Sequence, residues 1–247
     1  MMWELKMKVI FIVVLFFGFV AKADLASDLL EASDQGRGGI KEGIEWSGKV
    51  QTFENGNETN REFFIKAKDH DALVEATSPA KNKGEIFLFN DRQMWFFKPS
   101  LKKPVSISAR QKLSGQASNG DIASTHYARD YTATLEKTEV LDGVSHHVLL
   151  LKAKAPNLTY DQIRYWVSDK TKLATKAEFL TLQGVAFKKG YLEYGNKLKL
   201  GDKQITFVSK LTIVDAKYEN NKSILSYSNP KVVNHPVSIF NYNNMTR

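Results

Sequence analysis

Residues 90–108 read NDRQMWFFKPSLKKPVSIS, in which four consecutive apolar side chains stand between a polar turn and a lysine-rich segment. A strand with one buried face alternates between apolar and polar residues, whereas residues 94–97 are apolar on both faces. Because side chains alternate along a strand, Trp95 and Phe97 share one face, and Met94 and Phe96 share the other. We therefore expect a sheet covered on both faces here, either by ordinary core or by a cavity that holds a ligand.

Strand patterns with period two recur along most of the chain. Segments 85–89 and 93–98 flank the turn residues 90–92, and other pairs of segments flank the turns at 54–57 and 142–143. About eleven strands with almost no helix in the second half predict a mainly β protein, built as a barrel, a sandwich or one strongly curved sheet. No Pro/Ser-rich linker divides the chain, so a single domain over residues 24–247 is expected.

Two segments interrupt this strand pattern. Residues 24–33 carry leucines at helical spacing and are followed by the glycine-rich segment 35–39, which predicts a short amphipathic helix. Residues 109–131 are polar and weakly periodic, so we expect a loop there, with a short helix over 122–129. A long excursion of this kind inside a sheet protein is usually functional or mobile.

The N-terminus has the pattern of a secretory signal peptide. Lys6 and Lys8 precede the apolar run 9–21, and Ala21-Lys22-Ala23 forms a small-x-small cleavage site. The apolar run is shorter than the ~20 residues of a membrane-spanning helix. We expect residues 1–23 to be removed on export, which lowers the net charge from +8 to +6.

Composition narrows the classes of partner. An exported chain with this positive charge is expected to meet anionic lipid headgroups or acidic protein surfaces rather than nucleic acid. The sequence contains no cysteine, so neither a disulfide framework nor a lipid anchor on an N-terminal cysteine is expected.

Signals for catalysis and metal binding are weak. The sequence has no cysteine nucleophile, no Gly-x-Ser-x-Gly motif and no phosphate-binding glycine loop. His146 and His147 are neighbours on a predicted strand, so their side chains point to opposite faces and cannot bind one metal together. Residues 69–71 (DHD) lie in a predicted turn and are expected to be solvated. The loop 121–130 leaves an acid–base enzyme as an alternative, but we expect no enzyme, no metal and no cofactor.

Short motifs occur in a characteristic order between residues 83 and 121. Lys83-Gly84 comes first, then Trp95-x-Phe97-x-Pro99, then the strand 105–107 (VSI) and the glycine-containing loop 114–121. Further along, residues 165–169 (YWVSD) and 240–242 (FNY) continue the pattern. Over residues 27–242 this order resembles the LolA-like superfamily of outer-membrane lipoprotein-sorting proteins.

The resemblance implies a half-open, strongly curved antiparallel sheet of about eleven strands, whose concave side is closed by short helices around a cavity for acyl chains. It implies a monomeric periplasmic carrier of lipoprotein acyl chains or free lipid. Its donor would be an inner-membrane transporter or exporter, and its acceptor would lie at the outer membrane. The segments 24–33 and 109–131 would form the lid of the cavity. A sensor of envelope lipids that docks onto a membrane protein, and a lipid shuttle that serves an exporter, remain as alternatives.

Strand parity and the resemblance together give a set of expected site residues. Aromatic side chains suit an acyl-chain cavity because they offer large apolar area with few fixed contacts. The residues expected to line the cavity are Phe64, Phe87, Phe89, Trp95, Phe97 and Tyr165. The residues expected at the rim or in the lid loop are Lys98, Lys102, Lys103 and Asp121.

Overall fold

The computed structural model describes residues 17–90, 92–123 and 126–246. Their strands form one sheet of 13 strands and a separate two-stranded ribbon, β7 (Lys112–Ser114) with β8 (Ala117–Ser118). The order across the large sheet is β6-β5-β4-β3-β2-β1-β15-β14-β13-β12-β11-β10-β9, and β6 and β9 are its two edges among the described residues. The predicted mainly β, unclosed sheet is confirmed, with 13 strands in place of about eleven.

Neighbouring strands of the large sheet are antiparallel throughout, and most are joined by hairpins. The pairing of β1 with β15 joins the first and last strands of the chain. The strands of the first half are β1 (Ile44–Glu54), β2 (Asn57–Lys68), β3 (Asp71–Ser78), β4 (Ile86–Asn90), β5 (Gln93–Phe97) and β6 (Val105–Ile107). Those of the second half are β9 (Tyr131–Leu141), β10 (Val144–Ala153), β11 (Gln162–Ser168), β12 (Ala174–Leu180), β13 (Ala186–Leu200), β14 (Lys203–Asp215) and β15 (Lys222–Val232).

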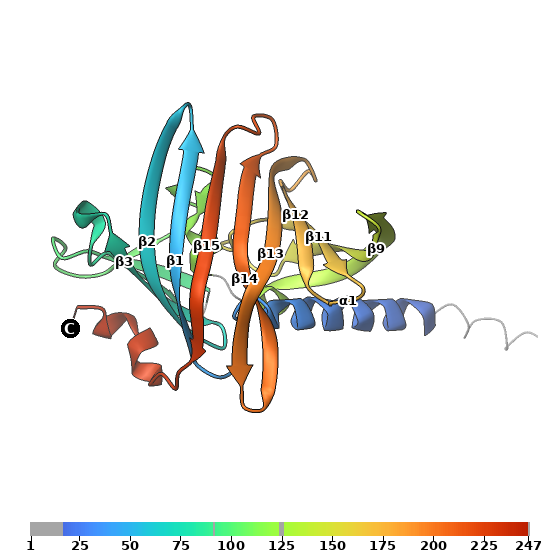
Figure 1. Cartoon of the computed structure of the whole chain (residues 1–247), viewed down its shortest axis with the longest axis horizontal. Helices are drawn as coiled ribbons and strands as arrows, with labels where there is room; N and C mark the ends of the chain where they lie inside the picture. The colour runs from blue at the N-terminus through green and yellow to red at the C-terminus, as the bar shows by residue number, and fades with distance from the viewer. Residues whose placement is uncertain (1–16, 91, 124–125, 247) are drawn as a thin grey trace, which may run out of the picture.

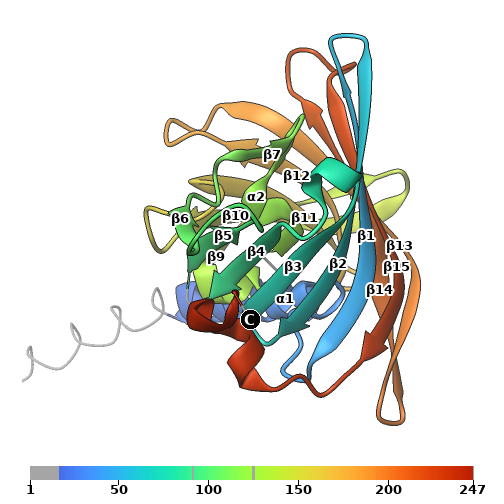
Figure 2. The same cartoon turned by 90° about the vertical axis from the view of Figure 1, so that its left-hand side faces the viewer.

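Helices occupy the inside of the curved sheet. Figure 2 shows α1 (Phe17–Gln35) and α2 (Asn119–Ala123) between its two halves, and α3 (Tyr127–Asp130) follows α2. Three short 3-10 helices complete the chain, namely η1 (Ala80–Asn82), η2 (Val237–Phe240) and η3 (Tyr242–Asn244). The predicted helix over 24–33 is therefore longer, and the segment 109–131 holds a ribbon and two short helices rather than a loop with one.

The predicted signal peptide falls mostly outside the described residues. Its positions 1–16 are not described, and positions 17–23 form the start of α1. In the part of the chain that the structure describes, no helix combines the length and the hydropathy that a membrane crossing requires.

Two hydrophobic clusters cover the two faces of the sheet. The larger lies on the concave side, where Leu29 and Leu30 of α1, Ile122 of α2 and Tyr127 of α3 pack against inward-facing strand residues. The smaller lies on the outer face, where Leu88 is covered by Phe240 and Met245 of the C-terminal segment. Figure 1 shows this segment beside β3, at the lower left. The expected coverage of both faces is confirmed.

The two faces of β5 are the reverse of the cavity assignment made from the sequence. Met94 and Phe96 belong to the concave cluster, whereas Trp95 and Phe97 belong to the outer cluster. Trp95 is stacked on Tyr242 of η3, with ring centroids 4.6 Å apart. Strand parity correctly grouped these side chains in pairs. It could not show that the C-terminal segment folds back over the outer face and buries the second pair.

Candidate functional site

The predicted cavity residues divide between the two faces of the sheet. Phe87, Phe89 and Tyr165 lie in the concave cluster. Phe64, like Trp95 and Phe97, is on the outer face, since its neighbour Phe63 takes the inward position with 1% exposure. The rings of Phe63 and Phe87 meet edge to face, with their centroids 6.4 Å apart. The ring centroids of Phe87 and Phe96 are 5.0 Å apart. The face expected to line the cavity was therefore the concave one on β4, but it was the outer one on β2 and β5.

The concave interior is closed and nearly full. Side chains of α1, α2 and α3 occupy it, and a void between them and the strands has a volume of about 20 Å³. A void of this size holds about one water molecule. Its lining residues are Arg37, Trp46, Asp121, Ile122, Leu192, Val208, Leu211 and Tyr227. We call α2 and α3, which lie in this interior, the helical plug.

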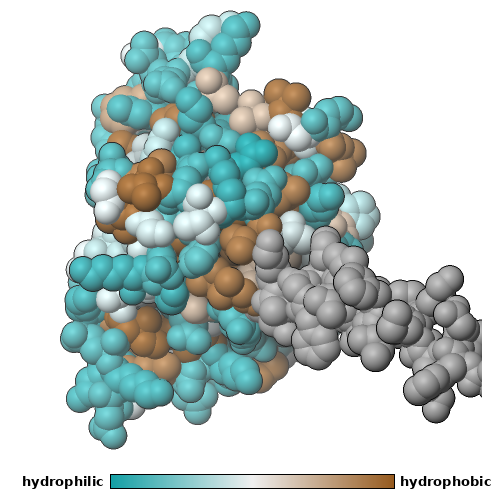
Figure 3. Space-filling model, turned by 90° about the vertical axis from the view of Figure 1, so that its right-hand side faces the viewer, coloured by the Kyte–Doolittle hydropathy of each residue, from teal (hydrophilic) through white to brown (hydrophobic). Residues whose placement is uncertain are grey.

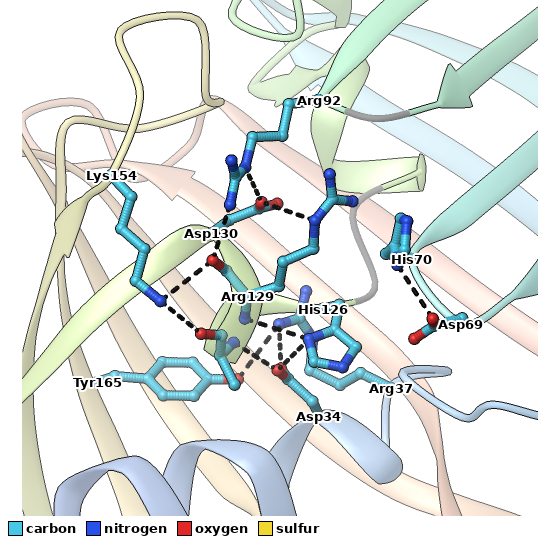
Figure 4. A network of polar contacts seen from close by, with 11 residues as sticks. Asp34, Arg37, Asp69, His70, Arg92, His126, Arg129, Asp130, Lys154 and Tyr165 are labelled. Carbon is cyan, nitrogen blue, oxygen red and sulfur yellow. Dashed lines mark hydrogen bonds and ion pairs between the residues drawn. The ribbon is translucent and has the colours of Figure 1, made fainter.

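Arg37 is a buried cation at the centre of the interior. It follows α1, and its guanidinium carbon lies 4.0 Å from the centroid of the Tyr127 ring. Its Nη1 atom donates to the Tyr165 hydroxyl at 3.5 Å and lies 3.9 Å from Asp34 Oδ1 (Figure 4). A cation over an aromatic ring away from water gives about 2 kcal/mol of attraction. Arg37 therefore links α1 to α3 and to β11.

Asp34 makes a second link between α1 and α3. Its Oδ2 atom accepts a hydrogen bond from the backbone N–H of Ala128 at 2.7 Å and lies 3.7 Å from Nδ1 of His126. Burial raises the pKa of Asp34 to about 6, because loss of hydration outweighs the attraction of Arg37. One carboxylate thus holds the start of α3 against the end of α1, and its charge is costly there.

Asp121, which was expected at the rim or in the lid loop, lies within the segment 109–131 and fixes α2. It is 7% exposed, accepts from the Tyr160 hydroxyl at 2.8 and 2.9 Å, and accepts from the Ser118 N–H at 2.7 Å. Burial raises its pKa and lowers that of Lys188, whose Nζ donates to Ser118 Oγ at 3.2 Å. A Cβ atom on Gly120 would lie 1.8 Å from Thr159 Oγ1, so glycine permits this close approach.

Contacts from the sheet hold the outer end of α3. Arg92 Nε donates to Asp130 Oδ1 at 2.9 Å, and Arg92 Nη2 donates to the Arg129 carbonyl at 3.1 Å. Lys154 Nζ donates to the carbonyls of Ala128 and Arg129 at 2.9 and 3.1 Å (Figure 4). The plug is therefore held in place by a small number of polar contacts in addition to its apolar side chains.

The polar residues of the loop 121–130 do not form one acid–base site. Asp121 bonds Tyr160, Asp130 bonds Arg92, and His126 lies beside Asp34, so the three belong to separate contacts. On β10, His146 Nε2 lies 2.9 Å from Thr175 Oγ1 and His147 Nε2 lies 3.0 Å from Asp169 Oδ1. Among the described residues, no group of three or more His, Asp or Glu side chains is placed to hold a metal ion.

The predicted rim lysines lie at the edge of the sheet, in the β5–β6 connection. Lys98, Lys102 and Lys103 are exposed and form no ion pair with another described residue. Gly84 lies against Pro99, since a Cβ atom on Gly84 would be 3.3 Å from its ring. The exposed Lys81 and Lys83 therefore stand near this connection. We call these five residues the lysine edge.

Comparison with known proteins places this architecture in a family. The structure of a LolA superfamily protein from Nitrosomonas europaea superposes with a TM-score of 0.78 and 27% sequence identity, covering 88% of this chain and 98% of that one. A family model described as "Uncharacterized protein" matches residues 68–247. The chain belongs to the LolA superfamily.

Other matches agree on the fold of this LolA-like protein. A domain from Vibrio parahaemolyticus, assigned as an outer membrane lipoprotein-sorting protein, gives a TM-score of 0.74 at 18% identity and covers 91% of this chain and 100% of that one. A DUF1329 family protein from Desulfovibrio piger gives 0.75 at 19% identity, with 91% and 99% covered. An argininosuccinate lyase from Sulfurisphaera tokodaii is 29% identical over 77 residues, which span 31% of this chain but only 16% of the lyase.

Proposed function

We propose that this LolA-like protein is a non-enzymatic carrier, which binds acyl chains of lipoproteins or lipids inside its curved sheet and moves them across the periplasm. The observation that carries the proposal is the plug in the concave interior. It consists of two short helices on one connection, and it is held by the contacts of Asp34, Asp121, Asp130 and Lys154. Such a plug can leave the interior without unfolding the sheet.

An exchange between plug and acyl chain is energetically reasonable. Each CH₂ group taken out of water gains about 0.8 kcal/mol. The displaced Ile122 and Tyr127 side chains lose apolar contacts, and the acyl chain replaces them with contacts to Phe63, Phe87 and Phe89. A carrier needs this near balance because it must release its cargo as well as bind it. Segments with few contacts open most easily, which suits α2 and α3.

The remaining parts of the proposal concern location and partners. The predicted signal peptide supports a place in the periplasm, with an inner-membrane transporter or exporter as the donor and an outer-membrane component as the acceptor. Membership of the LolA superfamily supports lipoprotein acyl chains as cargo, and free lipid is the alternative cargo. Lipids extracted from the purified protein and identified by mass spectrometry would distinguish the two.

A reversible lock on the connection that carries the plug tests the proposal. Thr52 Oγ1 of β1 and Ser114 Oγ of β7 are 2.9 Å apart, and the natural chain has no cysteine. A disulfide in the Thr52→Cys/Ser114→Cys variant would tie the ribbon before α2 to the sheet. We expect the oxidised variant to lose binding of a diacyl lipid, measured with a pyrene-labelled phospholipid, and to regain it on reduction.

The matched control is Thr52→Cys/Ser223→Cys, which joins two sheet strands whose hydroxyls are 3.2 Å apart and leaves the ribbon unlinked. Its oxidised form should bind the lipid as its reduced form does. Equal binding by the oxidised and reduced forms of the Thr52/Ser114 lock would contradict a plug that must move.

A further inference from the structure

A second cavity lies outside the plugged interior and is open. It has a volume of about 1000 Å³ and is formed by the end of α1, the β9–β10 and β11–β12 turns, and strands β13 and β14. This volume is at the upper end of the range for small-molecule sites. We propose that this cleft binds an anionic single-chain amphiphile, with its chain on an apolar floor and its carboxylate or phosphate head at a lysine rim.

The floor of the cleft is apolar and is contributed by β9, β10, the β11–β12 turn, β13 and β14. Its apolar lining includes Leu141, Val144, Leu173, Tyr191 and Ile205. Val144 and Tyr191 are 40% and 41% exposed, so they offer area that a ligand can cover. Single exposed apolar residues are ordinary on a protein surface, but here several share one hollow. Figure 3 shows apolar residues that reach the surface in separate patches among hydrophilic ones.

The rim of the cleft has a net positive charge. Lys170, Lys172 and Lys176 line it, and Asp142 is the one carboxylate among its lining residues. Asp169 neutralises Lys172 in part at 2.9 Å, and Glu178 neutralises Lys176 in part at 3.5 Å. Lys170 is exposed and forms no ion pair among the described residues. The hydroxyls of threonines 171, 175 and 206 also line the cleft and can donate hydrogen bonds. These groups complement an anionic head joined to an apolar chain.

The cleft is separated from the plugged interior by a thin wall. Gly36 belongs to this wall, because a Cβ atom there would lie 2.5 Å from Leu173 Cδ2 and 3.2 Å from the Tyr194 ring. Tyr194 lines the cleft on one side and packs against the concave cluster on the other. Because the cleft is open while the plug is in place, a ligand can enter it without any movement of α2 or α3.

A fluorescent fatty acid, 11-(dansylamino)undecanoic acid, tests the cleft by titration of the full chain. Val144→Trp should fill the floor and weaken binding at least about tenfold, a loss of about 1.4 kcal/mol. Val140→Trp is the matched control, since Val140 is 67% exposed and does not line the cleft. Equal binding by these two variants would overturn the proposal, with circular dichroism confirming that both fold.

The lysine rim is tested in the same assay at low salt. Lys170→Glu/Lys172→Glu should weaken binding of the anionic probe about tenfold or more. Lys49→Glu/Lys152→Glu makes the same charge change at two exposed lysines outside the cleft and should have little effect. Equal losses in both variants would show a non-specific charge effect and contradict the site. Competition by laurate and by lysophosphatidic acid then distinguishes a carboxylate head from a phosphate head. If neither compound competes with the probe, the proposed amphiphile site is contradicted.

The disulfide lock separates this site from the carrier interior. Oxidised Thr52→Cys/Ser114→Cys should bind the dansyl probe normally while its diacyl-lipid binding is lost. Loss of both ligands in the oxidised form would place the probe in the interior and overturn the cleft. Retention of both would instead contradict the carrier mechanism and leave the cleft supported.

Discussion

At the scale of single residues, the interior of this LolA-like protein is unusual in holding charges beside apolar side chains. Asp34 and Asp121 are buried carboxylates whose pKa values are raised, and both belong to the contacts that fix the plug. Burial makes these charges costly, and the hydrogen bonds donated by Ala128, Ser118 and Tyr160 offset part of that cost.

The burial of Asp34 predicts how the free energy of unfolding depends on pH. Its folded pKa is about 6 and its unfolded pKa is near 3.8, so the protonated form stabilises the fold. This stabilisation is complete below pH 3.8 and is lost as the pH rises through about 6. Relative to Asp34→Asn, the natural protein should therefore lose about 2 kcal/mol of unfolding free energy between pH 4 and pH 7.

Urea denaturation of both proteins at several pH values measures this difference. Comparing the two proteins at each pH cancels the contributions of the other carboxylates. A difference that is constant from pH 4 to pH 7, or that favours the natural protein at the higher pH, would contradict the burial of an ionisable Asp34 in the folded state.

Residue positions also show what the sequence could and could not predict. Phe87 and Phe89 were expected to face inward and do, because both share one parity on β4. Phe64 and Trp95 were placed on the wrong face because parity groups side chains without saying which face is concave. Arg37 lies in the glycine-rich segment 35–39, and its burial over Tyr127 depends on tertiary contacts that no local pattern reveals.

At the scale of elements, the C-terminal segment explains the apolar stretch 94–97. Its residues Phe240 and Met245 cover Leu88, and its Tyr242 stacks on Trp95. The motif FNY at 240–242 was recognised in the sequence, but its place over β4 and β5 was not, because it is more than 140 residues away in the chain. By contrast, hairpins with turns at 54–57 and 142–143 were predictable from local turn residues.

The stack between Trp95 and Tyr242 predicts a measurable effect. Tyr242→Ala should lower the unfolding free energy by about 1 kcal/mol and shift the Trp95 emission to longer wavelength, since the indole gains water. The control is Tyr218→Ala, because Tyr218 is 58% exposed and forms no ring stack among the described residues. Emission and stability that respond equally to both substitutions would argue against the C-terminal cover.

At the scale of the whole molecule, the mainly β, unclosed sheet was predictable because the order of motifs and the period-two segments extend over most of the chain. The state of the interior was not predictable, because the polar segment 109–131 gives no sign that Ile122 and Tyr127 will be buried inside the sheet. Its helices form only where tertiary contacts such as Tyr160 to Asp121 and Arg92 to Asp130 hold them.

The lysine edge predicts attraction to anionic membranes. Charge reversal at Lys98, Lys102 and Lys103 should abolish co-sedimentation with vesicles that contain phosphatidylglycerol, since each lysine near such a surface contributes about 1 kcal/mol. Binding of the natural protein should also weaken as salt is raised. Lysines at a sheet edge also prevent edge-to-edge association. A variant that aggregates but still binds vesicles would show that protection of the edge is their role.

The most direct test of the central claim asks which tryptophan touches the acyl chain. Trp46 faces the concave interior and lines its void, whereas Trp95 lies on the outer face. Bromine atoms on an acyl chain quench tryptophan fluorescence on contact. In variants that keep only Trp46 or only Trp95, a lipid brominated along its chain should quench Trp46 and leave Trp95 bright. Quenching of Trp95 alone, or of neither residue under conditions where lipid is bound, would contradict acyl-chain binding inside the sheet.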